Sequence, residues 1–300
     1  MSIDIIPISG EFVAKVVGID LSVPLTFEEI EAIERAIWRY GVLIFPNQPI
    51  SAGEQVRFAE SFGPLSTSLQ TKILHKVQDR LGNAAITDIS NVNSDGNVVG
   101  SRDTMALLNI GNMFWHSDAS YEHHPYRYGI LAAQSVVSWG GHTQFADLRA
   151  AYDSLDQRTK ALIADLIGVF YSHHTRDQMG FNDSEADRAA FPPVRWPLVR
   201  THAGSGRKVL WIDSKVTEIS GMSIPEGRAF VHEMIEHIGQ REHVYSHQWT
   251  PGDVVMWDNR SVLHRGRRFD LAERREMRRV STIDDSSSLG VVDTTKEYAA

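Results

Sequence analysis

The feature of this sequence that most restricts its fold is a series of short apolar segments separated by turn-forming residues. Residues 41–45 form one such segment, which stops at Pro46, and residues 129–139 form another, which stops at Gly140-Gly141. Short apolar runs between turn residues are typical of buried β-strands. Further segments of this kind close the chain at residues 244–250, 254–257 and 278–283. A mainly β protein is therefore expected.

A few longer segments carry the start signals of peripheral helices. Thr26 with Glu29, and Ser51 with Glu54, have the capping-box spacing, in which each side chain accepts a hydrogen bond from the other residue's backbone N–H group. Ser223 is the predicted start of a third helix. The apolar faces expected on the first and third helices are Phe27, Ile30, Ile33 and Ile37, and Phe230, Val231, Met234, Ile235 and Ile238.

The middle of the chain has weaker signals. A helix is expected near residues 153–168, and residues 196–201 and 209–212 are expected to pair as a β-hairpin across a glycine-rich turn. Residues 66–114 lack sustained periodicity and are interpreted as a long loop region with short strands, and residues 174–195 are interpreted as a polar loop. Many short strands with a few peripheral helices favour a double-sheet jelly roll.

The organisation of the chain points to one domain. The 300 residues contain no internal repeat and no linker-like stretch, so residues 1–300 are expected to form a single domain. Residues 285–300, which include three consecutive serines, are expected to be a mobile tail. The N-terminus lacks the pattern of a signal peptide, and no apolar run approaches the ~20 residues that a membrane-spanning helix needs. A cytoplasmic protein without a membrane partner is therefore predicted.

Composition excludes several classes of function. The chain has no cysteine, which excludes disulfides, zinc fingers and cysteine nucleophiles. Its net charge of −8 argues against a general nucleic-acid binder, whose affinity needs a basic face. The acidic balance and apolar content are compatible with a homo-oligomer, which is the expected assembly, without requiring one.

The strongest candidate for chemistry is a set of metal-ligand side chains. His116 and Asp118 are two positions apart, so in an extended segment both point to the same face. This spacing is common by chance, but His264 supplies a third candidate ligand at the expected end of a buried strand. Two histidines and one carboxylate form the facial triad of non-haem Fe(II) oxygenases. Such a triad leaves coordination positions open for an oxoacid and dioxygen, whereas a structural zinc site fills its four positions with protein ligands.

An arginine-rich run follows the third candidate ligand. Arg275 and Arg279 are four residues apart, so they share one face of an extended strand. A guanidinium group binds a carboxylate through two parallel hydrogen bonds. The run therefore suits the free carboxylate of a dicarboxylate that chelates the metal through its keto end. A solvated basic face is the alternative interpretation.

Taken in order and spacing, these motifs resemble the taurine/2,4-dichlorophenoxyacetate dioxygenase family. The matching motifs are Trp115-His116-Ser117-Asp118, Gly140-Gly141-His142-Thr143, Trp257-Asp258-Asn259-Arg260 with His264, and Arg275 with Arg279. The resemblance extends from Gly18 to Thr282. It implies a double-stranded β-helix fold, Fe(II) bound by His116, Asp118 and His264, and the cosubstrate 2-oxoglutarate bound by Thr143 and Arg275.

Within that family the sequence looks more like the 2,4-dichlorophenoxyacetate branch. The segments that carry this likeness are Asp88-Ile89-Ser90-Asn91-Val92, residues 196–208 and His264-Arg265-Gly266-Arg267-Arg268. The resemblance implies that Arg279 lies at the acidic group of a small organic acid, and that His202 and Asn91 also contact this substrate. It further implies that dioxygen is used to hydroxylate the carbon next to the ether oxygen of an aryloxyacetate, which gives a phenol and glyoxylate together with succinate and CO₂.

Two alternatives stay open at this point. The same chemistry could act on a sulfonate, an aryloxypropionate or another carboxylic acid, since only the substrate contacts would differ. A protein of another class, such as a metal-dependent hydrolase or a non-catalytic jelly-roll binding protein, could use the same three ligands with zinc.

Overall fold

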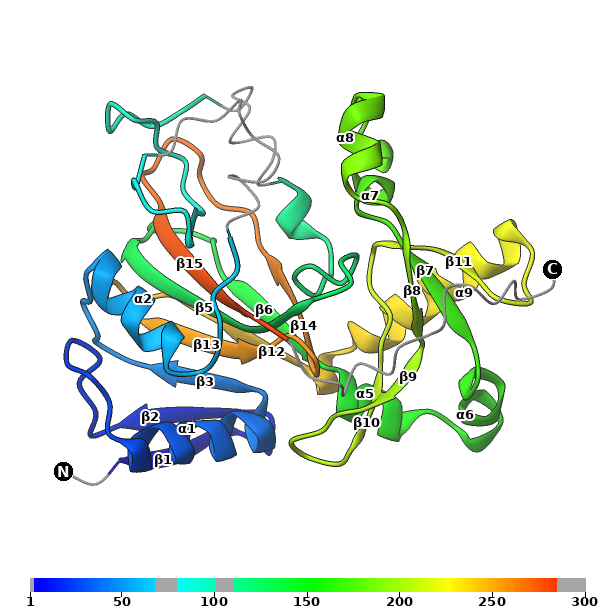
Figure 1. The fold of residues 1–300 in the computed structure, drawn as a ribbon, viewed down its shortest axis with the longest axis horizontal. Coiled ribbons are helices and arrows are strands. Elements are labelled where there is room, and N and C mark those ends of the chain that lie inside the picture. Colours follow the sequence, from blue (N-terminus) through cyan, green and yellow to red (C-terminus); the bar gives the residue numbers. More distant parts are fainter. Residues whose placement is uncertain (1–2, 68–79, 101–109, 285–300) are drawn as a thin grey trace.

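The computed structural model describes residues 3–67, 80–100 and 110–284, and its largest element there is a seven-stranded sheet (Figure 1). Every neighbouring pair in this sheet is antiparallel except β2 and β3, which run parallel. In spatial order its strands are β1 (Asp4–Ser9), β2 (Val13–Val17), β3 (Val42–Phe45), β13 (Val254–Asp258), β5 (Tyr126–Ser135), β15 (Glu276–Ile283) and β4 (Ile86–Asp88).

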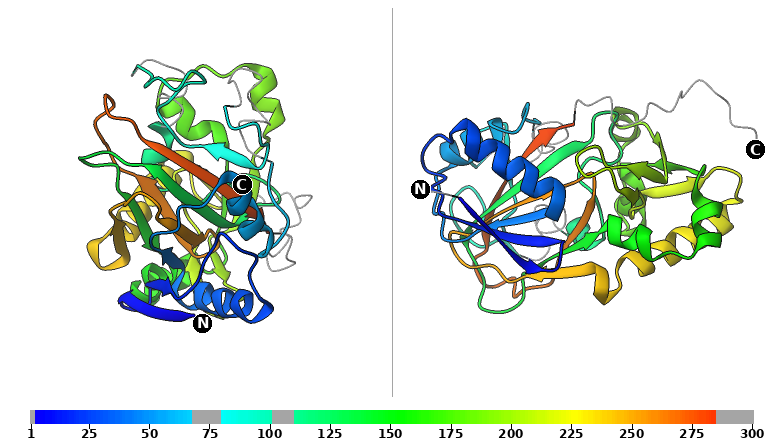
Figure 2. Two further views of the ribbon diagram at one scale, coloured as in Figure 1. Left: turned by 90° about the vertical axis from the view of Figure 1, so that its left-hand side faces the viewer. Right: turned by 90° about the horizontal axis from the view of Figure 1, so that it is seen from below.

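A three-stranded sheet faces the larger one. It consists of β12 (Val244–His247), β6 (Thr143–Asp147) and β14 (Val262–Gly266), with β6 in the centre. Buried apolar side chains from both sheets fill the space between them, including Phe145, Trp257 and Val262. Helices α1 (Phe27–Tyr40) and α2 (Ala52–Glu60) cover the other face of the larger sheet (Figures 1 and 2). The predicted jelly roll with peripheral helices is confirmed.

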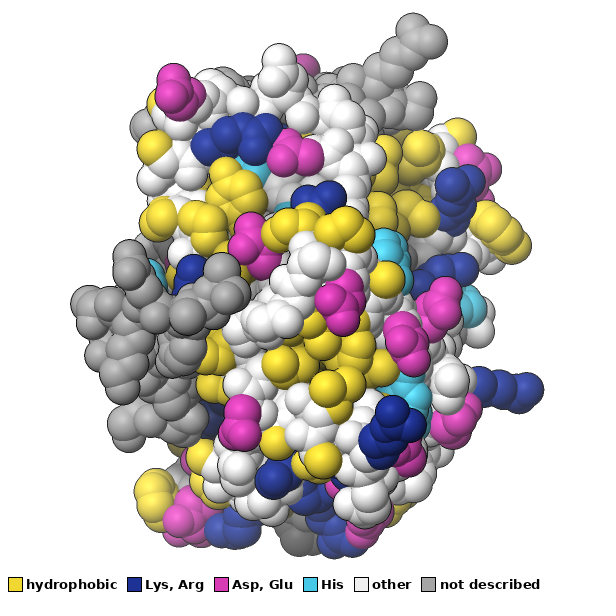
Figure 3. Space-filling view, turned by 90° about the vertical axis from the view of Figure 1, so that its right-hand side faces the viewer, with side chains coloured by type: hydrophobic (Ala, Val, Ile, Leu, Met, Phe, Trp, Pro, Cys, Tyr) yellow, Lys and Arg dark blue, Asp and Glu magenta, His cyan; other side chains and the backbone are white. Residues whose placement is uncertain are grey.

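Residues between β6 and β12 form a region beside the two sheets (Figures 1 and 2). Its strands are β7 (Ile167–Phe170), β8 (Val194–Pro197), β9 (Val199–Thr201), β10 (Lys208–Leu210) and β11 (Val216–Ile219). Its helices are α5 (Leu148–Ser154), α6 (Gln157–Ile163), α7 (Ser172–Gln178), α8 (Glu185–Ala190), α9 (Ile224–Ile238) and the 3₁₀ turn η2 (Arg241–His243); the other 3₁₀ turn, η1 (Gly111–Met113), precedes the predicted metal ligands. On the outer face of this region apolar side chains alternate with acidic and basic ones (Figure 3). No described helix is long and apolar enough to cross a membrane.

The helix-start predictions are confirmed by their hydrogen bonds. Complete capping boxes begin α1 at Thr26, α2 at Ser51 and α9 at Ser223. The apolar face of α1 is narrower than predicted, because Ile33 and Ile37 are buried but Phe27 is 69% exposed. Phe27 is the first residue of the helix. The one-domain assignment stays a prediction, and the expected tail at residues 285–300 lies outside the described residues.

The predicted helix at residues 153–168 is wrong. The segment contains the end of α5, then α6, and then the start of β7. Leu155 is extended, and the Asp156 carboxylate accepts hydrogen bonds from the backbone N–H groups of Arg158 and Thr159. An aspartate in this position starts a new helix, so the apolar residues on its two sides belong to separate elements.

The predicted loop at residues 174–195 is also wrong. It contains most of α7, all of α8 and the start of β8. These helices have only seven and six residues, too short to show periodicity. The expected hairpin is confirmed for β9 and β10, whereas β8 pairs with β7 instead.

Gly129 in β5 leaves room for a buried indole. A Cβ atom at this position would lie 2.2 Å from Cζ2 of Trp257 on the neighbouring strand. We expect Gly129→Ala to destabilise the fold by about 1–3 kcal/mol, the usual cost of an overpacked core, as measured by urea unfolding. Gly53→Ala in α2 is the control, since its Cβ would meet nothing within 4 Å and alanine favours helix by roughly 0.8–1 kcal/mol. Unchanged stability in Gly129→Ala would contradict this account.

Candidate metal centre

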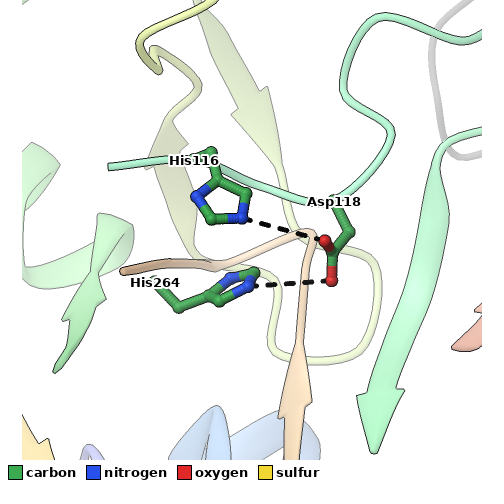
Figure 4. A group of neighbouring side chains, drawn as sticks. All are labelled: His116, Asp118 and His264. Atoms are coloured by element: carbon green, nitrogen blue, oxygen red, sulfur yellow. Dashed lines mark ion pairs between the residues drawn. The ribbon is translucent and has the colours of Figure 1, made fainter. Parts of the chain in front are cut away.

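The three predicted metal ligands lie together in the structure. Ligand atoms of His116, Asp118 and His264 are all within 4.8 Å of one another, and the three residues are buried (Figure 4). Nε2 of His116 lies 3.9 Å from Oδ1 of Asp118, and Nε2 of His264 lies 3.8 Å from Oδ2 of the same carboxylate. A metal ion could contact one atom of each residue and keep its remaining positions open.

Backbone pairing brings the two histidines into register. The N–H group of His116 donates to the carbonyl oxygen of His264 at 3.1 Å, and the reverse hydrogen bond measures 2.9 Å. The imidazole centroids are consequently only 4.2 Å apart. His264 lies inside its own strand, β14, and not at the end of the preceding strand β13 as predicted. The strand was missed because its second half, His264-Arg265-Gly266, is not apolar.

Both imidazoles are held in the uncharged form that binds metals. Burial, the neighbouring His264 and the charge of Lys215 lower the pKa of His116 well below its usual range. Burial, Arg279 and Lys215 do the same to the pKa of His264. Nδ1 of His116 lies 2.8 Å from the carbonyl oxygen of Phe114, so this nitrogen carries the proton and Nε2 presents its lone pair to the centre.

The carboxylate ligand has one occupied and one free oxygen. Arg279 donates from Nη1 to Oδ1 of Asp118 at 2.6 Å. Oδ2 of Asp118 is buried and has no hydrogen-bond partner within residues 3–67, 80–100 and 110–284. A buried carboxylate oxygen without a partner is costly, and a cation bound between it and the two imidazoles would remove that cost. The donor set and this unpaired oxygen both fit Fe(II).

A cavity of about 360 Å³ opens beside His264. Its wall includes His264, Arg279, Thr143 and Arg275, so it joins the metal centre to the predicted cosubstrate residues. The apolar side chains that line it are Ile89, Ile110, Met113, Leu131, Trp257, Phe269 and Leu271. A ligand here would meet an apolar surface with cationic groups at defined points, which is the usual character of a small-molecule site.

Arg275 is a buried cation that has no carboxylate partner among the described residues. Its guanidinium group donates to the carbonyl oxygens of Ile89 and Gly141, each at 3.4 Å, and burial lowers the pKa of Arg275 to about 10. Thr143 lines the same cavity, and its hydroxyl oxygen accepts a hydrogen bond from the indole N–H of Trp249 at 3.0 Å. The threonine can still donate its own proton. These residues fit the distal carboxylate of 2-oxoglutarate.

The arginines that precede Arg275 and Arg279 make their contacts outside the cavity, as expected when side chains alternate between the two faces of an extended segment. Arg274 pairs with Glu276 and with the carbonyl oxygen of Gly96, and Arg278 donates to the carbonyl oxygen of Ile50 at 2.6 Å. Neither lines the cavity that Arg275 and Arg279 share.

Asn91 lies on the cavity wall, but its amide is already engaged. Its nitrogen donates to the carbonyl oxygens of Leu271 and Glu273, at 3.2 and 2.7 Å, and its oxygen accepts from the N–H group of Arg275 at 2.8 Å. The side chain therefore holds the backbone that leads into Arg275. The predicted contact of Asn91 with substrate stays a prediction, and it would have to coexist with these bonds.

His202 is not among the residues that line the cavity, and its predicted contact with substrate stays a prediction. Its Nε2 pairs with Oδ2 of Asp258 at 2.9 Å, its Nδ1 lies 2.8 Å from the hydroxyl oxygen of Ser205, and it is 2% exposed. Burial by itself raises the pKa of the Asp258 carboxyl, but Arg260 and His202 together hold it far below its usual range. Because its two ring nitrogens are bonded to Ser205 and Asp258, His202 has a structural role here.

Sequence reasoning missed three residues around the ligands. The side-chain oxygen of Asn259 accepts from the N–H groups of Asp118, at 3.2 Å, and of the Trp257 indole, at 2.9 Å. Asp213 and Lys215 contact Ser117 from the segment between β10 and β11. Asn259 is in a recognised motif, but no sequence signal distinguishes Asp213 or Lys215.

Comparisons with known proteins agree with this geometry. The family model described as taurine catabolism dioxygenase TauD, TfdA family matches residues 4–281. The alpha-ketoglutarate-dependent 2,4-dichlorophenoxyacetate dioxygenase of Cupriavidus pinatubonensis is 44% identical over 95% of this chain and 99% of that protein. The (S)-phenoxypropionate/alpha-ketoglutarate-dioxygenase of Sphingobium herbicidovorans is 32% identical over 91% and 92%. A crystal structure of AAD-2 in complex with Mn(II) and N-oxalylglycine has a TM-score of 0.87 and 38% identity, covering 96% of this chain and 99% of that one.

These matches include the metal centre and the cavity, and they decide against the alternatives of a hydrolase and a non-catalytic binding protein. The chain is an alpha-ketoglutarate-dependent dioxygenase, and it belongs to the taurine catabolism dioxygenase TauD, TfdA family.

Proposed function

We propose that this enzyme uses Fe(II) and 2-oxoglutarate to hydroxylate the carbon next to the ether oxygen of an aryloxyacetate. The observation that carries the proposal is the cavity, in which two inward-facing arginines share one apolar space with the metal centre. One cation suits the cosubstrate and the other suits the acid group of the substrate. The 2,4-dichlorophenoxyacetate dioxygenase relative supports this choice of substrate.

The proposed roles follow from the contacts. His116, Asp118 and His264 hold the iron, and Arg275 with Thr143 holds the distal carboxylate of 2-oxoglutarate. Bound iron supplies the activation of dioxygen, which is coupled to the conversion of 2-oxoglutarate into succinate and CO₂. Holding both reactants in one orientation accounts for much of such catalysis, so the remaining residues act by placing the substrate.

The substrate is held by its two ends. Its carboxylate pairs with Arg279, whose Nη1 is 2.6 Å from the Asp118 ligand, and this pairing keeps the adjacent carbon close to the metal. Its ring packs on the apolar wall, which includes Phe269 and Leu271. Replacing a C–H bond of that carbon by C–OH gives a hemiacetal. Its bond to the aryl oxygen then breaks, the hydroxyl proton passes to that oxygen, and phenol and glyoxylate leave.

Arg279→Gln is expected to raise the KM for the acid substrate about 10-fold to 150-fold, since a hydrogen bond to a charged group contributes roughly 1.5–3 kcal/mol. Initial rates should be measured at saturating iron, because Arg279 also contacts Asp118. Arg278→Gln is the matched control, as its side chain bonds to the Ile50 carbonyl oxygen, away from the cavity. An unchanged KM in Arg279→Gln would remove this residue from substrate binding.

The proposed function is tested by succinate formation. Protein loaded with Fe(II) under anaerobic conditions is given air, 2-oxoglutarate and one acid from a panel of phenoxyacetate, both enantiomers of 2-phenoxypropionate, cinnamate and taurine. The expected result is succinate together with released phenol from phenoxyacetate. Faster turnover of one phenoxypropionate enantiomer would favour the second candidate, which the (S)-phenoxypropionate relative supports. Succinate driven best by taurine or cinnamate would overturn the aryloxy assignment.

A further inference from the structure

Ser117, the residue between two of the proposed ligands, has all of its polar groups bonded. Its N–H group donates to Oδ2 of Asp213 at 3.2 Å, and its carbonyl oxygen accepts from Nζ of Lys215 at 3.3 Å. Its hydroxyl group donates to the carbonyl oxygen of Asn259 at 2.8 Å. Ser117 is 1% exposed. These bonds fix the backbone of the residue between His116 and Asp118 from three directions.

The Asp213 carboxylate holds the rest of the same turn. Oδ2 also accepts from the hydroxyl group of Ser120 at 2.7 Å, and Oδ1 accepts from the N–H group of Lys215 at 2.8 Å. Ala119, between these contacts, has a φ of 54°. This left-handed conformation is unfavourable for alanine and persists where the surroundings enforce it. The contacts of Asp213 therefore lie on both sides of the strained residue.

Asp213 and Lys215 form a buried pair with no net charge. Nζ of Lys215 lies 3.6 Å from Oδ2 of Asp213, and the two side chains are 13% and 2% exposed. Neither residue lines the cavity, so neither is placed to bind substrate or 2-oxoglutarate. The pair bonds both backbone groups of Ser117, the residue between two of the proposed ligands.

We propose that Asp213 and Lys215 are positioning residues, which fix the His116–Ser120 turn so that the atoms of two metal ligands keep the spacing a metal ion needs. This inference rests on the proposed metal site. Lys215 also acts through its charge, which lowers the pKa of both ligand histidines, whereas the positioning role proposed here is geometric. Outer contacts of this kind typically change metal affinity by about 10-fold to 100-fold.

The test is the affinity of the full chain for Mn(II), measured from the EPR signal of the free ion. The double variant Asp213→Asn/Lys215→Met removes both charges and leaves the net charge unchanged. We expect it to bind Mn(II) about 10-fold to 100-fold more weakly, and its Co(II) complex to have a shifted visible absorption spectrum. The matched control is Arg176→Met/Asp183→Asn, since this pair is also partly buried but contacts no proposed ligand.

Each outcome separates the inference from the function on which it rests. A wild-type chain that binds no Mn(II) would overturn the metal site itself. If the wild type binds but the double variant keeps the same affinity and spectrum, or if the control loses as much affinity, the positioning role is overturned. Should circular dichroism show that the double variant does not fold, Asp213→Asn alone, which preserves the shape of the side chain, is judged by the same two criteria.

Discussion

His264→Ala is expected to lower both Mn(II) affinity and the rate of succinate formation by more than about 100-fold, because even partners outside the ligand set change metal affinity by 10-fold to 100-fold. The variant loses one ligand nitrogen, and the two remaining ligands, His116 and Asp118, bind a divalent ion much less well. EPR measures the loss of metal affinity, and chromatography of succinate measures the loss of activity.

The control for this prediction is His243→Ala. His243 is also buried, but it bonds to Ser154 and to the carbonyl oxygen of His237, in the region beside the two sheets. Its loss should change thermal stability and leave Mn(II) affinity close to that of the wild type. Wild-type metal affinity in His264→Ala would show that the ion binds elsewhere.

Arg275→Met is expected to raise the KM for 2-oxoglutarate by roughly 30-fold to several thousand-fold, since removing one member of a buried charged pair costs about 2–5 kcal/mol. The same substitution should not lower the melting temperature of the ligand-free protein, because the buried guanidinium group has no carboxylate partner in the part of the chain that the structure describes. An isolated buried charge is unfavourable. Weaker binding of 2-oxoglutarate without a loss of thermal stability would identify Arg275 as a residue whose charge partner is the bound cosubstrate.

Arg274→Met provides the comparison for Arg275. Arg274 is the preceding residue, but its side chain is half exposed and pairs with Glu276. Its replacement should leave the KM for 2-oxoglutarate within about twofold, as expected for an exposed ion pair that contributes roughly 0–1 kcal/mol. If both variants raised this KM equally, a general disturbance of the segment before β15 would explain the result better than a cosubstrate contact.

The parts of the fold that depend on local chemistry could be predicted from the sequence. The capping boxes at Thr26, Ser51 and Ser223 need only residues three positions apart, and all three begin helices. The helix break at Asp156 was missed because apolar residues continue on both sides of it. β14 was missed because its second half is not apolar. Its pairing with β6, more than 100 residues earlier, leaves no local pattern that could replace this signal.

The candidate site also has features that follow from local spacing and features that depend on distant residues. The spacing of His116 and Asp118 and the four-residue interval between Arg275 and Arg279 are local, and the structure places each pair on a shared site. The direction of the His202 ring is set by Asp258, 56 residues away. Asp213 and Lys215 reach Ser117 across 96 and 98 residues. Contacts over such distances cannot be read from residue type and spacing alone.

The strand order of the larger sheet has a consequence for how the protein is made. β1, β2 and β3 join the other strands of that sheet only through β13, which comes from Val254–Asp258. On a ribosome these first three strands leave the exit tunnel long before β13 is synthesised, and until then the open edge of β3 has no partner. Unpaired strand edges in incomplete chains promote aggregation. We therefore expect the sheet to assemble only after Val254–Asp258 has been synthesised, with the nascent part before it as a substrate for chaperones.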